Sequence, residues 1–176
     1  MSKNKKIILS AMLLALLIVL SRFLSIETQF LVLSFSFIPI MMSAIWLGPK
    51  YSMMIAALGD LIGALLFPFG AYFPGFTLSA AISGLIYGLF LYNKNNASIS
   101  NIKFLLKLII SSILVLGLVN IFITSFWLHM LYGKAYLVII STRAVSQLIM
   151  LPIQVTIIYI LNKVLNPIFD KYLMQD

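Results

Sequence analysis

Long apolar runs, separated by short polar or proline- and glycine-containing stretches, dominate the hydrophobic pattern of this chain. A helix of about 20 apolar residues is long enough to cross the roughly 30 Å hydrocarbon core of a bilayer. The pattern predicts six such helices, with expected ranges 5–24, 31–48, 50–67, 77–93, 101–128 and 136–165. We therefore predict an all-α, polytopic membrane protein in which residues 1–176 form a single six-helix transmembrane domain.

The second range is the least regular of the six. A helix that began only at Pro39 would be too short to cross the bilayer at 1.5 Å per residue, so we expect Glu27–Phe37 to be partly inserted. Pro49 directly before the third range fits a helix start, where proline is tolerated. Pro152 is expected to kink the last helix.

Composition supports membrane insertion. Hydrophobic residues make up 62% of the chain and charged residues 9%, against about 25% charged in a soluble domain. The basic start and the first apolar run resemble a signal peptide, but Ser21–Leu24 offers no small-residue cleavage site, so we expect this run to remain as the first helix. The short ends leave no room for a soluble catalytic domain, and the absence of cysteine excludes disulfides and thiolate sites.

The net charge of +8 is distributed unevenly along the chain. Nine of the twelve cations lie at one set of predicted helix ends: Lys3, Lys5, Lys6, Lys50, Lys94, Lys103, Lys107, Lys163 and Lys171. Only Arg22, Lys134 and Arg143 fall toward the other side. Because cytoplasmic helix ends are enriched in lysine and arginine, we predict that both termini are cytoplasmic in the cell membrane. The charge therefore reports topology and indicates no nucleic-acid partner.

The stretch Phe67–Ser79, FPFGAYFPGFTLS, combines helix-breaking residues with an unusual density of aromatic rings. The predicted topology places it at the outer membrane face. Two interpretations stay open. A rigid aromatic loop suits the binding of a flat organic molecule, and interfacial aromatics also anchor helix ends.

Small residues recur at four-residue spacing, which places them on one helix face. Gly59 and Gly63, and the set Ala80, Gly84 and Gly88, are typical of close helix packing in lipid. Ala11 and Ala15 repeat the pattern in a helix flanked by lysines. For those two alanines, packing within the bundle and docking of a partner protein both remain open.

A few polar residues interrupt the apolar runs. Asp60 lies well inside a predicted span, so its carboxylate needs a partner, and Arg22 and Arg143 are the available cations. The group either stabilises packing as an ion pair or also contacts a polar ligand. Asn120 and Gln147 similarly suit either a heterocycle edge or hydrogen bonding between helices.

Motifs for catalysis are absent from the sequence. It contains no G-x-x-x-x-G-K-[ST], H-E-x-x-H or G-x-S-x-G pattern, and the single His129 has no carboxylate cluster to form a metal site. We therefore expect neither enzymatic activity, nor a bound metal, nor a cofactor. If the protein moves a molecule uphill, the energy comes from another source.

Five segments together resemble a known family: F-S-F-I-P-I (35–40), W-L-G-P-K (46–50), G-D-L-I-G (59–63), P-F-G-A-Y-F-P-G-F-T-L-S (68–79) and G-L-I-Y-G-L-F-L-Y (84–92). They resemble the substrate-binding S components of energy-coupling factor (ECF) transporters, and most closely the folate-specific members. The similarity covers roughly residues 5–92 and is weaker in the last two helices. Ser36 departs from the glycine that is more frequent there.

The resemblance implies a six-helix protein that captures a vitamin from outside. Its implied partners are a transmembrane coupling protein and two cytosolic ATPases, so ATP would be used by those subunits and not by this chain. The segment Ala11–Ala15 matches the family's A-x-x-x-A surface, which docks the coupling protein. The S component would then topple in the membrane to release its substrate inside.

For folate, the resemblance and the residue chemistry suggest three groups of contacts. The pteridine would stack on aromatic rings, with Tyr72, Phe73, Phe76 and Trp127 as candidates. Its amide-like edge would use Asp60, Asn120 or Gln147, and the glutamate carboxylates would use Arg22, Lys134 or Arg143. The alternatives are an S component for a different vitamin or metabolite, and a self-sufficient carrier in which Asp60 couples proton movement.

Overall fold

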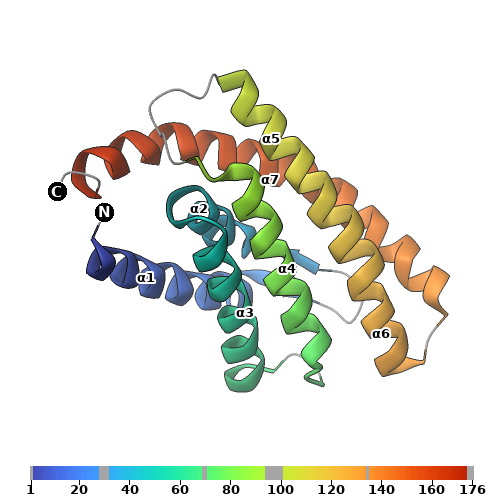
Figure 1. The fold of residues 1–176 in the computed structure, drawn as a ribbon. Helices are drawn as coiled ribbons and strands as arrows, with labels where there is room; N and C mark the ends of the chain where they lie inside the picture. Colours follow the sequence, from blue (N-terminus) through green and yellow to red (C-terminus); the bar gives the residue numbers. More distant parts are fainter. Residues whose placement is uncertain (1, 28–31, 69–70, 94–100, 134, 174–176) are drawn as a thin grey trace.

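A computed structural model describes residues 2–27, 32–68, 71–93, 101–133 and 135–173 (Figure 1). The helices are α1 (Lys3–Arg22), α2 (Phe37–Leu47), α3 (Pro49–Leu66), α4 (Pro74–Leu91), α5 (Asn101–Leu114), the π-helical η1 (Val115–Ile123), α6 (Thr124–Tyr132) and α7 (Tyr136–Leu173). Because α5, η1 and α6 form one continuous helix over 101–132, the described residues contain six helices. The predicted all-α, six-helix architecture is confirmed.

The prediction for the second helix is wrong in its extent. Strands β1 (Ser25–Glu27) and β2 (Val32–Ser34) form a small antiparallel hairpin in which Ser25 pairs with Ser34. The backbone of 32–34 therefore bonds to another strand, and the following helix begins only at Phe37. At eleven residues, α2 is about 16 Å long and cannot cross a bilayer alone.

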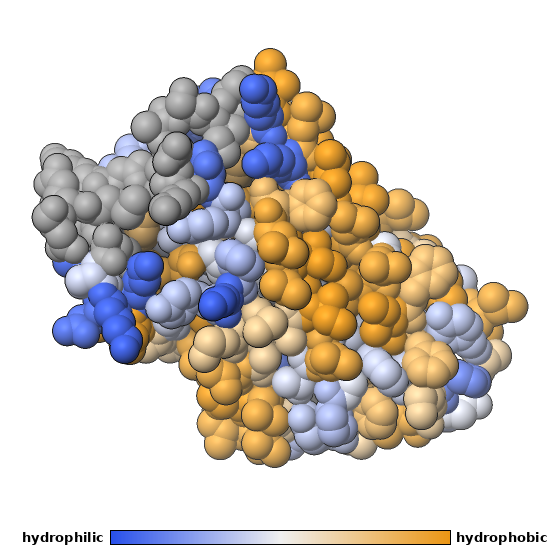
Figure 2. Space-filling view, viewed as in Figure 1, coloured by the Kyte–Doolittle hydropathy of each residue, from blue (hydrophilic) through white to orange (hydrophobic). Residues whose placement is uncertain are grey.

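Within the described residues, four helices are long and apolar enough to cross a membrane: α1, α4, the continuous helix 101–132 and α7 over Tyr136–Phe169. The last helix extends beyond its expected end at 165, passing through Pro152 and Pro167. Large apolar side chains are exposed along these helices, including Ile7, Leu118 and Leu148. Figure 2 shows this apolar surface between hydrophilic regions, as expected for a protein surrounded by lipid.

The aromatic stretch 67–79 is only partly a loop. Helix α4 begins at Pro74, whose missing N–H costs nothing in the first turn, so the second half of the stretch is helical. Residues 69 and 70 lie outside the described part. The expected helix start at 77 is therefore three residues late.

The glycines of α3 and α4 lie at close helix contacts, as predicted. A Cβ at Gly84 would overlap the main-chain carbonyl of Ser52, and one at Gly88 would overlap the main chain of Pro49. A Cβ at Gly59 would overlap Leu17 of α1. These contacts join α1, α3 and α4 into one packed unit. Figure 1 places both chain termini at the same end of this bundle.

Candidate functional site

A cavity of about 390 Å³ lies between the helices, within the range of volumes that hold small organic ligands. Arg22 at the end of α1, Tyr72 before α4 and Tyr132 at the end of α6 all line it. Each of these residues lies at the opposite end of its helix from the end that faces the chain termini. The cavity therefore reaches the end of the bundle away from the termini, and it extends inward as far as Tyr87 of α4 and Gln154 of α7.

Three helices each contribute one face to the cavity wall. From α4 come Phe76, Ser79, Ala80, Ser83 and Tyr87; from η1 and α6 come Leu116, Asn120, Thr124, Leu128 and Tyr132; from α7 come Arg143, Gln147, Met150 and Gln154. Residues three or four apart share a helix face, which explains why polar side chains distant in sequence meet here.

The π-helical segment shapes one wall. The amide of Thr124 and its Oγ1 both donate to the carbonyl of Val119, five residues back, instead of to Asn120. The Asn120 carbonyl accepts a 3.1 Å hydrogen bond from Arg143 Nε. The widened helix turn thus makes a main-chain oxygen available to orient a cavity-lining guanidinium.

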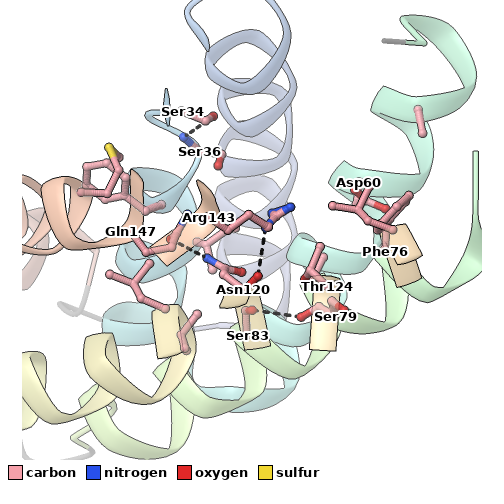
Figure 3. A pocket seen from close by; sticks show the side chains of 18 of the residues that line it. Ser34, Ser36, Asp60, Phe76, Ser79, Ser83, Asn120, Thr124, Arg143 and Gln147 are labelled. Atoms are coloured by element: carbon pink, nitrogen blue, oxygen red, sulfur yellow. Dashed lines mark hydrogen bonds between the residues drawn. The ribbon is translucent and has the colours of Figure 1, made fainter. Parts of the chain in front are cut away.

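Asn120 also forms a side-chain hydrogen bond with Gln147. Its Nδ2 donates to Gln147 Oε1 at 3.2 Å, and Figure 3 shows Asn120, Arg143 and Gln147 as one connected group. Arg143 is 7% exposed and Gln147 5% exposed, so neither is solvated at the surface. The pair therefore bonds between helices, which is one of the two predicted roles, and it lines the cavity, where contact with a heterocycle stays a prediction.

Asp60 forms a second polar group, which Figure 3 shows beside Phe76 and apart from Gln147. Thr77 Oγ1 donates to Asp60 Oδ2 at 2.6 Å, and the Tyr72 hydroxyl lies 3.3 Å from Thr77 Oγ1. The charge of Arg22 also attracts this carboxylate. Of the two cations expected to partner Asp60, the structure thus places Arg22 near it, and it adds a threonine that the sequence did not indicate.

Two of the predicted aromatic residues stand behind the cavity wall. Phe73 and Trp127 are not among the lining residues; their ring centroids are 5.6 Å apart, and Phe73 packs edge-on to Phe76 at 6.0 Å. Trp127 Nε1 donates to Ser79 Oγ at 3.1 Å. Both rings therefore contact lining residues, and direct stacking on a ligand stays a prediction.

The other predicted candidates meet in one cavity: Arg22, Asp60, Tyr72, Phe76, Asn120, Arg143 and Gln147. Sequence reasoning missed several lining polar residues, among them Ser34, Ser79, Ser83, Thr124, Tyr87 and Gln154. Two of these, Tyr87 and Gln154, are almost fully buried and joined by a 3.4 Å hydrogen bond. The spacing of Ser79, Ser83 and Tyr87 was a usable signal, because it repeats every four residues.

Ala11 and Ala15 lie elsewhere, on an exposed face of α1. Lys134, the third candidate cation, falls outside the described residues. Within the described ranges, no group of three or more His, Cys, Asp or Glu side chains could hold a metal ion. The cavity combines aromatic rings, two guanidinium groups, a carboxylate and amides, which suits an organic anion that carries a flat polar heterocycle.

Comparisons with known proteins agree with this chemistry. A family model described as "ECF transporter, substrate-specific component" matches residues 5–162. The folate transporter FolT of Clostridium novyi is 42% identical over 90% of this chain and 88% of its own length. FolT of Leuconostoc mesenteroides is 41% identical over 93% and 88%. A crystal structure of FolT bound with folic acid superposes with a TM-score of 0.78 at 38% identity, covering 90% of this chain and 91% of that one.

Proposed function

This chain belongs to the substrate-specific components of ECF transporters, and we propose that it captures folate at the outer membrane face for ATP-driven uptake. Members of this family are transport components and not enzymes. The observation that carries the proposal is the cavity: it brings together a carboxylate, two arginines, an amide pair and aromatic rings. The similarity to proteins named as folate transporters supports the choice of ligand.

Folate joins a pteridine ring to a benzoyl-glutamate tail. The pteridine edge presents adjacent N–H donors and a carbonyl acceptor, which suit a carboxylate such as Asp60 or the amides of Asn120 and Gln147. Tyr72 and Phe76 offer rings for stacking, worth about 0.5–1.5 kcal/mol per good aromatic contact beyond buried area. The glutamate carboxylates need cations, and Arg22 and Arg143 provide them in the geometry best suited to carboxylates.

Release into the cell requires further subunits. We propose that a transmembrane coupling protein docks on the exposed face of α1 that carries Ala11 and Ala15, where small side chains permit close helix contact. Two cytosolic ATPases would supply the energy, so this chain itself needs no nucleotide or other cofactor. The lysine-rich helix ends, with both chain termini, would face the cytoplasm.

Calorimetric titration of the detergent-purified protein tests the ligand. We expect nanomolar binding of folate and no binding of riboflavin, thiamine or biotin. Tight binding of one of those three with no response to folate would keep the family and reject folate as the substrate.

Uptake into liposomes tests the mode of transport. The chain alone is expected to bind folate without accumulating it. The complete transporter with internal ATP should accumulate it. Accumulation by the chain alone, driven by a proton gradient, would reject the proposal in favour of a carrier in which Asp60 couples protons.

A further inference from the structure

Gly63 lies on the face of α3 that meets α1, one turn after Asp60. A Cβ built at Gly63 would lie 2.6 Å from Arg22 Nε, 3.0 Å from Nη2 and 3.2 Å from Cζ. The first distance is shorter than real side-chain contacts. The guanidinium of Arg22 therefore occupies the space that any side chain at position 63 would take.

Arg22 also lines the cavity and attracts the Asp60 carboxylate. We propose that Gly63 is a positioning residue for ligand binding: its missing side chain lets the Arg22 guanidinium lie across α3, beside Asp60 and facing the cavity. This inference rests on the proposed function, because it assigns Arg22 a role toward the bound anion.

The other helix glycines show why Gly63 is different. Gly84 and Gly88 face main-chain atoms of α3, and Gly59 faces the apolar side chain of Leu17. Those three contacts concern only how closely the helices pack. Among the described glycines, only Gly63 has a charged side chain as the nearest neighbour of its added Cβ.

Backbone freedom does not explain the glycine either. Gly63 is inside α3, where alanine is more favourable than glycine by about 1 kcal/mol. Gly63→Ala therefore gains helix propensity, and the atoms it displaces belong to the guanidinium end of a long, flexible side chain. The variant should fold as well as the wild type while the guanidinium leaves its place beside Asp60.

The experiment compares Gly63→Ala with Gly59→Ala, which alters the same helix face one turn earlier. We expect Gly63→Ala to weaken folate binding about tenfold, the size of effect of losing a hydrogen bond to a charged group. Its melting temperature without ligand should be equal to or above that of the wild type. Gly59→Ala should lower the melting temperature, because Leu17 is buried, and should leave folate affinity within about twofold.

A double-mutant cycle with Arg22→Ala then separates positioning from general packing. Once Arg22 is removed, Gly63→Ala should cause no further loss of affinity, whereas the effect of Gly59→Ala on melting temperature should persist. Wild-type affinity in Gly63→Ala, or an equal loss with and without Arg22, would overturn the proposal.

Failure of the proposed function gives a different result. A wild-type protein that does not bind folate would reject the proposed function. The double-mutant cycle would then be measured through the melting temperatures of the four proteins without ligand. The effects of Gly63→Ala and Arg22→Ala must be non-additive there too, or the positioning role is rejected on its own. The same measurement applies if Arg22→Ala leaves no measurable binding.

Discussion

The two ends of the bundle are built on opposite principles. At the end near the termini, helices touch through main-chain atoms: Gly84 and Gly88 of α4 admit Ser52 and Pro49 of α3. Trp46 there stacks on Phe169 with ring centroids 4.8 Å apart. At the other end, the same helices surround a cavity.

The difference lies in what holds the helices in place. The closed end uses shape, because backbone contact leaves no room for adjustment. At the open end, hydrogen bonds made by side chains keep the walls together: Asn120 Nδ2 with Gln147, Arg143 with the main-chain carbonyl of Asn120, and Thr77 with Asp60. Substitutions should therefore act through size at the closed end and through chemistry at the open end.

The largest expected effect is that of Gly88→Ala at the closed end. The added Cβ overlaps the main chain of Pro49, which cannot rotate away. We expect a loss of about 3 kcal/mol in stability, seen as a lower melting temperature in detergent, with folate affinity of the folded fraction unchanged. Gly117→Ala is the matched control, because a Cβ there meets no atom within 4 Å. Equal melting temperatures for the two variants would contradict this account of the closed end.

Arg143→Ala tests the open end. It removes a buried cation whose Nε donates to the Asn120 carbonyl. We expect folate affinity to fall at least tenfold, about 1.4 kcal/mol, measured by calorimetry on a variant whose melting confirms a folded protein. Arg143→Lys retains the charge without the forked guanidinium geometry, so its folate affinity should lie between those of the wild type and Arg143→Ala. Unchanged affinity in a folded Arg143→Ala protein would remove Arg143 from the site.

The two tryptophans give a smaller, paired test. Trp127→Phe removes the hydrogen bond to Ser79, a lining residue, and should weaken folate binding by about 1 kcal/mol. Trp46→Phe removes the 3.1 Å bond to Asn166 at the closed end and should cost similar stability without changing affinity. Measuring both affinity and melting temperature for each variant checks this; the reverse outcome would mean that the two ends are not separable.

The smallest expected effect on the isolated protein is that of Ala15→Leu. The Ala15 side chain is exposed on α1 and belongs neither to the cavity lining nor to the buried core. Folate affinity and melting temperature of the variant should therefore match those of the wild type. Uptake by the complete transporter should nevertheless be lost, because the larger side chain blocks close helix contact with the coupling protein. Normal uptake would show that docking occurs elsewhere.

The sequence predicted best those features that depend on local hydrophobicity. Run length located six helices, since a bilayer demands a minimum span. Run length gave the wrong start for the helix predicted over 31–48, because β2 pairs with β1 and apolar content does not reveal such a contact between segments. The same limit applies to η1, since its hydrogen bonds reach five residues back without any change in apolar pattern.

Prediction of the site followed a similar division. Asp60, Arg143 and Gln147, which do line the cavity, were singled out because polar and charged groups are costly in lipid and need a partner there. Ser79 and Ser83 were missed because serine in a membrane helix commonly bonds to its own backbone, as Ser83 does here. Phe73 and Trp127 were identified as aromatic candidates, but only the structure shows that they contact the lining residues Phe76 and Ser79 and do not line the cavity themselves.

The π-helical segment has a consequence for sequence alignment. A π turn within an α-helix contains an extra residue, so an otherwise similar protein without it would show a one-residue gap between 115 and 123. The π turn absorbs that extra residue, so positions after the gap keep their helix face. What changes is the carbonyl at 120, which in a regular α-helix would accept from the amide four residues later, and such a protein would need another acceptor for its arginine. A single-residue gap in this helix is therefore a readable sign of a rebuilt cavity.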